Sequence, residues 1–153
     1  PISAAHPAGH VGDLLFFSRN LAEDDKIEGA LCCGIDCFST IYNYERRKSV
    51  RTGQTGFIGL VSVLANDGHI SKGNREGVIE NLELHLTSRL RTGDVFCRRS
   101  LSQILLLLPD MAETNLQLIE KRIHKIFRST ADQGTFTLKI DFQPIRALDP
   151  FGE

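Results

Sequence analysis

The sequence predicts an α+β domain of the ferredoxin-like, split β-α-β type, in which helices pack on a mostly antiparallel sheet. Three segments carry apolar residues at helical spacing, and strand-like apolar runs lie between and after them. Their order is helix, strand, helix, strand, strand, helix, strand. A chain of 153 residues with 41% hydrophobic side chains can bury one core, so we expect a single globular domain at residues 25–150.

Residues 1–24 are expected to precede this domain as a linker tail and a lead-in helix. Pro1–Gly12 is rich in Ala, Gly, Pro and His without periodicity, which is typical of a linker. From Asp13 to Asp25, apolar residues at spacings of three and four predict a short amphipathic helix. The only methionine is Met111, so we expect upstream domains in the same chain.

The first half of the domain should hold a helix followed by a buried strand. Asp36–Arg51 places apolar residues on one face and basic residues in its last turn, which suits the helix dipole. Phe57–Ala65 is an almost continuous apolar run, which indicates a central strand covered on both faces. Asn66-Asp67-Gly68 predicts a turn.

The second half should hold a helix, a hairpin, a helix and a last strand. Apolar residues every three to four positions from Val78 to Leu90 predict a helix that ends at Thr92-Gly93. Asp94–Arg99 and Ile104–Leu108 indicate a hairpin with a four-residue tip, Ser100–Gln103. Leu116–Arg128 is amphipathic, and Thr135–Phe142 alternates as a strand with one solvated face does.

Composition and charge exclude several classes of function. Eighteen basic and nineteen acidic residues give a net charge of -1, which argues against a direct nucleic-acid ligand. The longest aliphatic run, Ile104–Leu108, is far too short to span a membrane, and the opening residues lack a secretory signal, so the cytoplasm is expected. Four cysteines then indicate reduced thiols, and no second Cys/His cluster supports a metal site. No cofactor is expected.

The segment from Leu90 to Pro109, LRTGDVFCRRSLSQILLLLP, resembles the diguanylate cyclase (GGDEF) domain. In that family a helix ends in Arg-x-x-Asp, a strand of five residues follows, and a hairpin tip carries the signature. The resemblance covers roughly residues 36–146 and implies the nucleotide-cyclase fold. It is most similar to degenerate GGDEF domains in the C-terminal regions of some bacterial transcriptional regulators, whose tip reads Ser-x-Ser-Gln.

The resemblance places the signature on Ser100, Leu101, Ser102, Gln103 and Ile104, where none of its five residue types is present. Cyclisation of GTP needs two Mg²⁺ held by carboxylates. The strand Phe57–Ala65 contains no Asp or Glu, and Gln103 stands where an acidic residue would be. We therefore expect no enzymatic activity and no catalytic residue or metal site.

Arg91 and Asp94 occupy the Arg-x-x-Asp positions that, in the family, form the inhibitory site for cyclic di-GMP. An arginine fork can bind phosphate or a guanine edge, and the aspartate can accept from guanine nitrogens. Arg98 would add a second contact from the same strand face. The other interpretation is that Arg91 and Asp94 pair with each other at a helix-to-strand turn.

The function expected from the sequence is a non-catalytic regulatory or sensory domain of a bacterial cytoplasmic regulator that binds a cyclic dinucleotide such as cyclic di-GMP. One alternative is a protein–protein interaction or dimerisation module with no ligand, in contact with upstream domains or a second copy. The other alternative is a residual nucleotide-handling enzyme.

Overall fold

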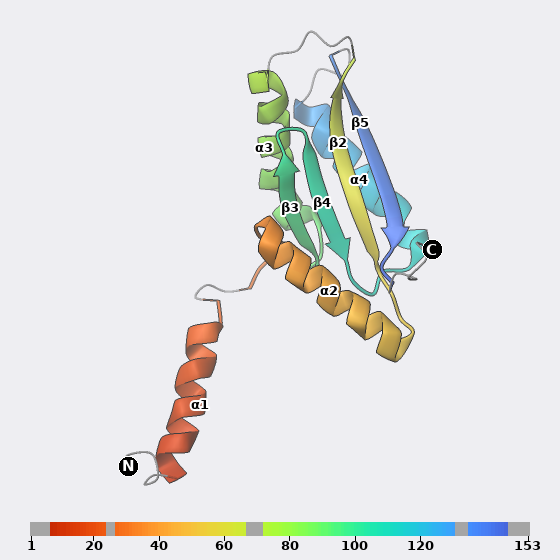
Figure 1. The fold of residues 1–153 in the computed structure, drawn as a ribbon. Helices are drawn as coiled ribbons and strands as arrows, with labels where there is room; N and C mark the ends of the chain where they lie inside the picture. Colours follow the sequence, from red (N-terminus) through yellow and green to blue (C-terminus); the bar gives the residue numbers. More distant parts are fainter. Residues whose placement is uncertain (1–6, 24–26, 67–71, 131–134, 147–153) are drawn as a thin grey trace.

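The computed structural model describes residues 7–23, 27–66, 72–130 and 135–146 (Figure 1). This part of the chain holds five strands and four α-helices. In chain order the elements are α1 (Pro7–Leu21), β1 (Leu31–Cys32), α2 (Ile35–Thr52), β2 (Phe57–Ala65), α3 (Lys72–Arg89), β3 (Val95–Ser100), β4 (Gln103–Leu108), the 3-10 turn η2 (Glu113–Asn115), α4 (Leu116–Thr130) and β5 (Phe136–Pro144).

The strands form one sheet in the order β1-β3-β4-β2-β5. All neighbouring pairs are antiparallel except β1 with β3. β4 lies between β2 and β3, so the β2-α3-β3 unit is split by a strand from later in the chain. This arrangement confirms the predicted ferredoxin-like α+β fold and its mostly antiparallel sheet.

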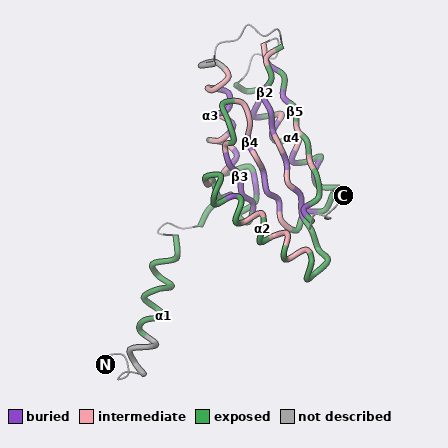
Figure 2. Tube along the Cα trace, viewed as in Figure 1, coloured by how far each residue is buried: buried purple, intermediate pink, exposed green. Residues whose placement is uncertain are grey.

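Helices α3 and α4 cover one face of the sheet and enclose the larger core (Figures 1 and 2). Leu82 and Leu86 of α3 and Ile123 of α4 have no solvent exposure. They pack with strand residues such as Val61 and Leu106. The apolar spacing that predicted these helices is therefore the stripe that meets the sheet.

Helix α2 covers part of the opposite face through a smaller core. Phe38 packs there with Val95, Cys97, Leu107 and Ile145. The helix ends at Gly53, whose left-handed φ of 75° suits glycine, and whose N–H donates to the Ser49 carbonyl at 2.9 Å. The predicted helix Asp36–Arg51 is confirmed within one residue at each end.

The N-terminal region differs from the prediction. The helix begins at Pro7, inside the segment interpreted as a linker, and ends at Leu21, before the acidic residues that would oppose its dipole. Residues 1–6 and 24–26 lie outside the described residues. The structure also adds β1, a two-residue strand that the sequence did not predict.

Gly29 allows β1 to reach the sheet. Its φ is 67°, and a Cβ there would stand 2.0 Å from the Thr87 carbonyl oxygen of α3. Ala30 N–H donates to that same oxygen at 2.9 Å, and Leu31 N–H then donates to the Asp94 carbonyl at 3.0 Å. Only glycine permits this approach without strain, so residue 29 fixes how the chain enters the domain.

Three further expectations need correction. The hairpin tip is Leu101-Ser102 and not four residues, because Ser100 pairs with Gln103 beyond a bulge at Arg98. β2 is not the central strand, since β4 occupies the middle of the sheet, and Leu64 on its open face is 45% exposed. α3 begins at Lys72, six residues before Val78. The predicted turn at residues 66–68 lies mostly outside the described residues.

The other predicted elements match within two residues, and β5 shows the expected alternation of buried and exposed positions. Among the described residues, none of the helices combines the length and apolar character that crossing a bilayer requires.

Candidate functional site

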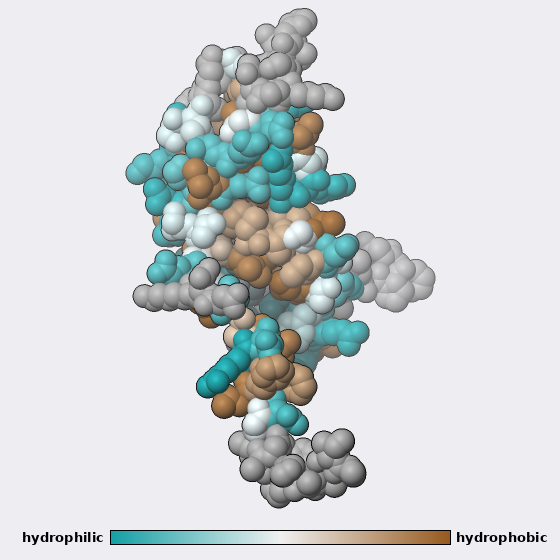
Figure 3. All heavy atoms as spheres, turned by 90° about the vertical axis from the view of Figure 1, so that its left-hand side faces the viewer, coloured by the Kyte–Doolittle hydropathy of each residue, from teal (hydrophilic) through white to brown (hydrophobic). Residues whose placement is uncertain are grey.

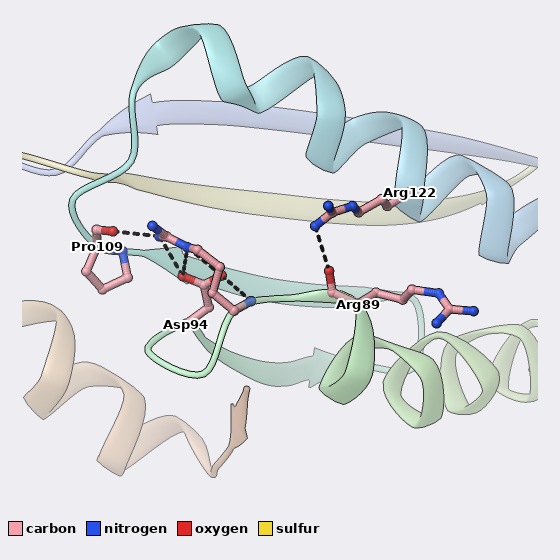
Figure 4. A network of polar contacts seen from close by, with 5 residues as sticks. Arg89, Asp94, Pro109 and Arg122 are labelled. Atoms are coloured by element: carbon pink, nitrogen blue, oxygen red, sulfur yellow. Dashed lines mark hydrogen bonds and ion pairs between the residues drawn. The ribbon is translucent and has the colours of Figure 1, made fainter. Parts of the chain in front are cut away.

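Arg91 and Asp94 form an ion pair in the turn between α3 and β3, and this pair is called the latch below (Figure 4). The Asp94 side chain is completely buried, and that of Arg91 is 43% exposed. The Arg91 guanidinium donates from Nη2 to Oδ1 at 2.7 Å and from Nε at 3.1 Å. The backbone N–H of Arg91 donates to Oδ2 at 2.8 Å, and the N–H of Asp94 returns to the Arg91 carbonyl at 2.9 Å.

The latch also ties the two ends of the β3–β4 hairpin together. Arg91 Nη2 donates to the Pro109 carbonyl at 2.6 Å, eighteen residues away along the chain. Val95 is in register with Leu107, so Asp94, just before β3, and Pro109, just after β4, lie at the same open end of the hairpin. Nearby, Arg122 of α4 donates to the Arg89 carbonyl at 3.2 Å, at the end of α3. Among the described residues, the donors to the Asp94 carboxylate thus all belong to Arg91 in the same turn, as the pairing interpretation expects.

Arg98 does not share partners with Arg91 among the described residues. Its guanidinium pairs with Glu76 at 3.1 Å and with Glu83 at 3.5 Å, both on α3. Its Nε donates to the Ser100 carbonyl at 3.3 Å. Arg98 is four positions after Asp94, which is about 13 Å along an extended chain. Arg98 therefore lies towards the hairpin tip and contacts α3.

The hairpin tip brings two neutral polar side chains together. Gln103 lies opposite Ser62 of β2, and its amide Nε2 donates to Ser62 Oγ at 3.3 Å. Ser62 is buried. The Ser102 carbonyl accepts from Val63 N–H at 2.9 Å, and Ser102 N–H donates to Ser100 Oγ at 3.2 Å. Leu101 is 40% exposed at the turn, and Ile104 is buried in the core.

This arrangement offers a metal ion only hydroxyl and amide groups. Mg²⁺ binds through carboxylates that supply negative charge, and none of the side chains just named carries one. Within the described ranges, no group of three or more His, Cys, Asp or Glu side chains could hold a metal ion. Glu76 and Glu83, which α3 brings to the hairpin, are instead paired with Arg98.

Two parts of these sites escaped the sequence reasoning. The partners of Arg98 were missed, although Glu76 and Glu83 are seven residues apart and so share one helix face. The Pro109 carbonyl was also missed, although a hairpin register from residue 95 to residue 107 would have placed it beside Asp94.

Comparison with solved structures supports the fold. A crystal structure described as a DGC protein from Thermotoga maritima is similar, with a TM-score of 0.61 and 18% sequence identity. The match covers 78% of this chain and 85% of that one. No family model matches the sequence, and no curated protein does. The chain therefore has an α+β, DGC-like fold with a five-stranded mixed sheet.

Proposed function

We propose that this chain is a non-catalytic regulatory domain built on the diguanylate cyclase fold, and that it acts through protein contacts. The observation that carries the proposal is the Gln103–Ser62 hydrogen bond at the hairpin tip. In a cyclase of this fold, carboxylates on the first strand and at the tip would hold the metal ions, as the sequence resemblance implies. Here the tip and its neighbouring strand meet through an amide and a hydroxyl.

The lack of carboxylate charge at the hairpin tip affects both tasks that the metal ions perform. Two divalent cations must lower the pKa of the attacking hydroxyl and neutralise the charge that develops on the transferred phosphoryl group. An amide oxygen is a weak ligand for a hard dication and adds no negative charge. Ser100 and Leu101 also place side chains where the family signature has glycine and lets the backbone approach a nucleotide.

A metal titration tests this proposal. GTP at a fixed concentration is titrated with Mn²⁺ with and without the domain, and free Mn²⁺ is measured by electron paramagnetic resonance. We expect the two curves to coincide, because GTP itself binds Mn²⁺ and the tip supplies no carboxylate that would bind more. An additional, protein-dependent and stoichiometric loss of free Mn²⁺ would contradict the proposal and favour a residual nucleotide-handling enzyme.

The contact surface that we propose is helix α1, with a second copy of this chain as its partner. Five large apolar residues of α1 are at least half exposed, namely Leu14, Leu15, Phe16, Phe17 and Leu21. Together they present on the order of 600 Å² of apolar surface, and Leu14, Phe17 and Leu21 share one face of the helix. In Figure 1 the helix stands apart from the sheet and from the other helices.

The spacing of these residues suits pairing between helices. Leu14, Phe17 and Leu21 are separated by three and four residues, which is the seam of a two-stranded coiled coil. Sedimentation equilibrium of the domain should therefore show a dimer. Phe17→Asp should shift it to a monomer, whereas Leu84→Asp, at an exposed position of α3, should leave the dimer intact. A wild-type domain that is monomeric would exclude this contact.

A second candidate function is reception of a cyclic dinucleotide, and the exposed edge of Arg91 favours it. The guanidinium could bind a phosphate while still holding Asp94. Asp94 itself is buried and already accepts from Arg91, so guanine could reach it only if the latch opened. Calorimetric titration with cyclic di-GMP distinguishes the two functions: heat that saturates, and that Arg91→Ala weakens more than tenfold, would support a receptor.

A further inference from the structure

All four cysteines of the chain gather where the N-terminal segment joins the domain. Cys32 is in β1, Cys33 follows it, Cys37 lies in the first turn of α2, and Cys97 is in β3. The pairing of Cys32 with Phe96 brings this end of β1 beside Cys97. Cys32 and Cys37 are exposed, Cys33 is half-buried and Cys97 is buried. Figure 3 shows an apolar patch about halfway up the domain on the side of the molecule that holds β3 and α3.

The backbone holds Cys33 and Cys37 in place from both sides. Cys33 N–H donates to the Phe96 carbonyl at 3.1 Å, which fixes the residue on the edge of the sheet. Phe38, next to Cys37, is buried against the sheet, and its N–H donates to the Gly34 carbonyl at 2.9 Å. These anchors hold the two cysteines four residues apart in the sequence, one just after β1 and one in the first turn of α2, and Cys37 is close enough to raise the pKa of Cys33.

From this geometry we propose that Cys33 and Cys37 are a thiol–disulfide exchange site that takes low-molecular-weight disulfides of the glutathione type. Cys37 is the attacking thiol, because it is the exposed member of the pair and a disulfide in solution can reach it. Cys33 is the resolving thiol, because it is half-buried against the core and holds its proton.

The exchange has two balanced steps. The Cys37 thiolate attacks one sulfur of glutathione disulfide, forms a mixed disulfide and releases one glutathione thiolate, which takes up a proton. Cys33 then gives up its proton to water, attacks the Cys37 sulfur and expels the second glutathione. The protein loses two hydrogen atoms, and glutathione disulfide is reduced to two thiols.

The surroundings of Cys33 make the second step slow at neutral pH. Burial, followed by the neighbouring Cys37 side chain, raises the pKa of Cys33 to about 12. The neighbouring thiols of Cys97 and Cys32 also raise the pKa of Cys33. Glu83 of α3 raises the pKa of Cys32 and of Cys97, after burial. The mixed disulfide on Cys37 should therefore accumulate before the intramolecular disulfide forms.

The disulfide would join the segment that leads in from α1 to helix α2. In the reduced protein hydrogen bonds and packing hold this junction, so the exchange would change how firmly the start of α2 is tied to the end of β1. This consequence does not depend on the hairpin tip or on the latch, so the experiment below tests it separately from the proposed function.

The experiment treats the reduced domain with glutathione disulfide and follows it by intact mass and peptide mapping. We expect an early glutathione adduct on Cys37 and then a Cys33–Cys37 disulfide. The rate of the second step should rise about tenfold per pH unit between about pH 7 and pH 9, because it follows the thiolate fraction of Cys33.

Three serine variants complete the test. Cys33→Ser should stop at the adduct on Cys37, and Cys37→Ser should form no intramolecular disulfide. Cys32→Ser, the matched exposed control, should still form the glutathione adduct on Cys37 and then the Cys33–Cys37 disulfide. A disulfide of any other connectivity, a wild-type protein that carries only glutathione adducts, or a protein that does not react would overturn the proposal.

Discussion

Removing the Arg91 guanidinium should destabilise the domain much more than removing an ordinary surface arginine. In Arg91→Ala, Asp94 keeps only one of its donors, the backbone N–H of residue 91. A buried ion pair that loses one partner costs about 3 to 5 kcal/mol. The Arg91 side chain is 43% exposed, so water can enter the vacated space and hydrate the Asp94 carboxylate, which offsets part of this cost. The expected loss in free energy of unfolding is therefore about 2 to 3 kcal/mol.

Two further variants separate geometry from charge. Arg91→Lys keeps the charge but cannot fork onto the carboxylate and reach the Pro109 carbonyl at once, so it should recover less than half of the loss. Arg98→Ala is the matched control, because its ion pairs to Glu76 and Glu83 are partly solvated. Pairs of that kind contribute about 1 kcal/mol or less.

Urea unfolding followed by circular dichroism measures these differences, since the chain has no tryptophan. Equal losses for Arg91→Ala and Arg98→Ala, or a loss below about 1 kcal/mol for Arg91→Ala, would refute the latch as a structural element. The side chain would then be free to serve a ligand.

Three other variants or conditions test the fold around the site. Leu107→Ala should cost about 2 to 5 kcal/mol in urea unfolding, because Leu107 is fully buried between the sheet and α2; a cost under about 1 kcal/mol would mean that this face is not packed. Gly29→Ala should detach β1, seen as faster hydrogen exchange at the Leu31 and Cys33 amides, and unchanged exchange there would contradict the tight approach to Thr87. The pKa of Cys33 is raised in the folded state, so its stabilising effect is complete below about pH 9 and is lost as the pH rises towards 12. The melting temperature under reducing conditions should therefore fall over that pH range, and it should fall less in Cys33→Ser. Parallel curves of melting temperature against pH for the two proteins would argue against the raised pKa.

Apolar periodicity made most of the fold predictable, because each helix and long strand buries one continuous set of side chains. α4 is the clearest case: the segment Leu116–Arg128 was expected to be an amphipathic helix, and its Ile119, Ile123 and Ile126 are buried. The hairpin was equally clear, since the run from Ile104 to Leu108 has few alternatives to a buried strand. Such elements are determined by their own residues.

The missed elements depend on contacts that no local pattern encodes. β1 has two residues, both exposed, and forms because Gly29 lets the chain pass close to α3. The bulge between Arg98 and Ser100 shortened the hairpin tip, and nothing in the local residues specifies a bulge there. The partners of Arg98 likewise depend on how α3 lies beside β3.

At the candidate site, the sequence identified the residues but not their state. Arg91 and Asp94 were expected either to bind a ligand or to pair with each other, and the structure shows them paired with Asp94 fully buried. Burial of Asp94 arises from the hairpin register and from Pro109, which are tertiary features. The four cysteines were expected as reduced thiols, and their gathering at one junction also arises only in the fold.

The most direct test of the central claim is a turnover assay. The domain, as a dimer if it forms one, is incubated with GTP and either Mg²⁺ or Mn²⁺, and the products are separated by chromatography beside an active diguanylate cyclase in the same buffer. Because the hairpin tip and β2 meet through the amide of Gln103 and the hydroxyl of Ser62, with no carboxylate between them, we expect no cyclic di-GMP above the blank. Cyclic di-GMP that accumulates with time and with protein concentration would contradict it.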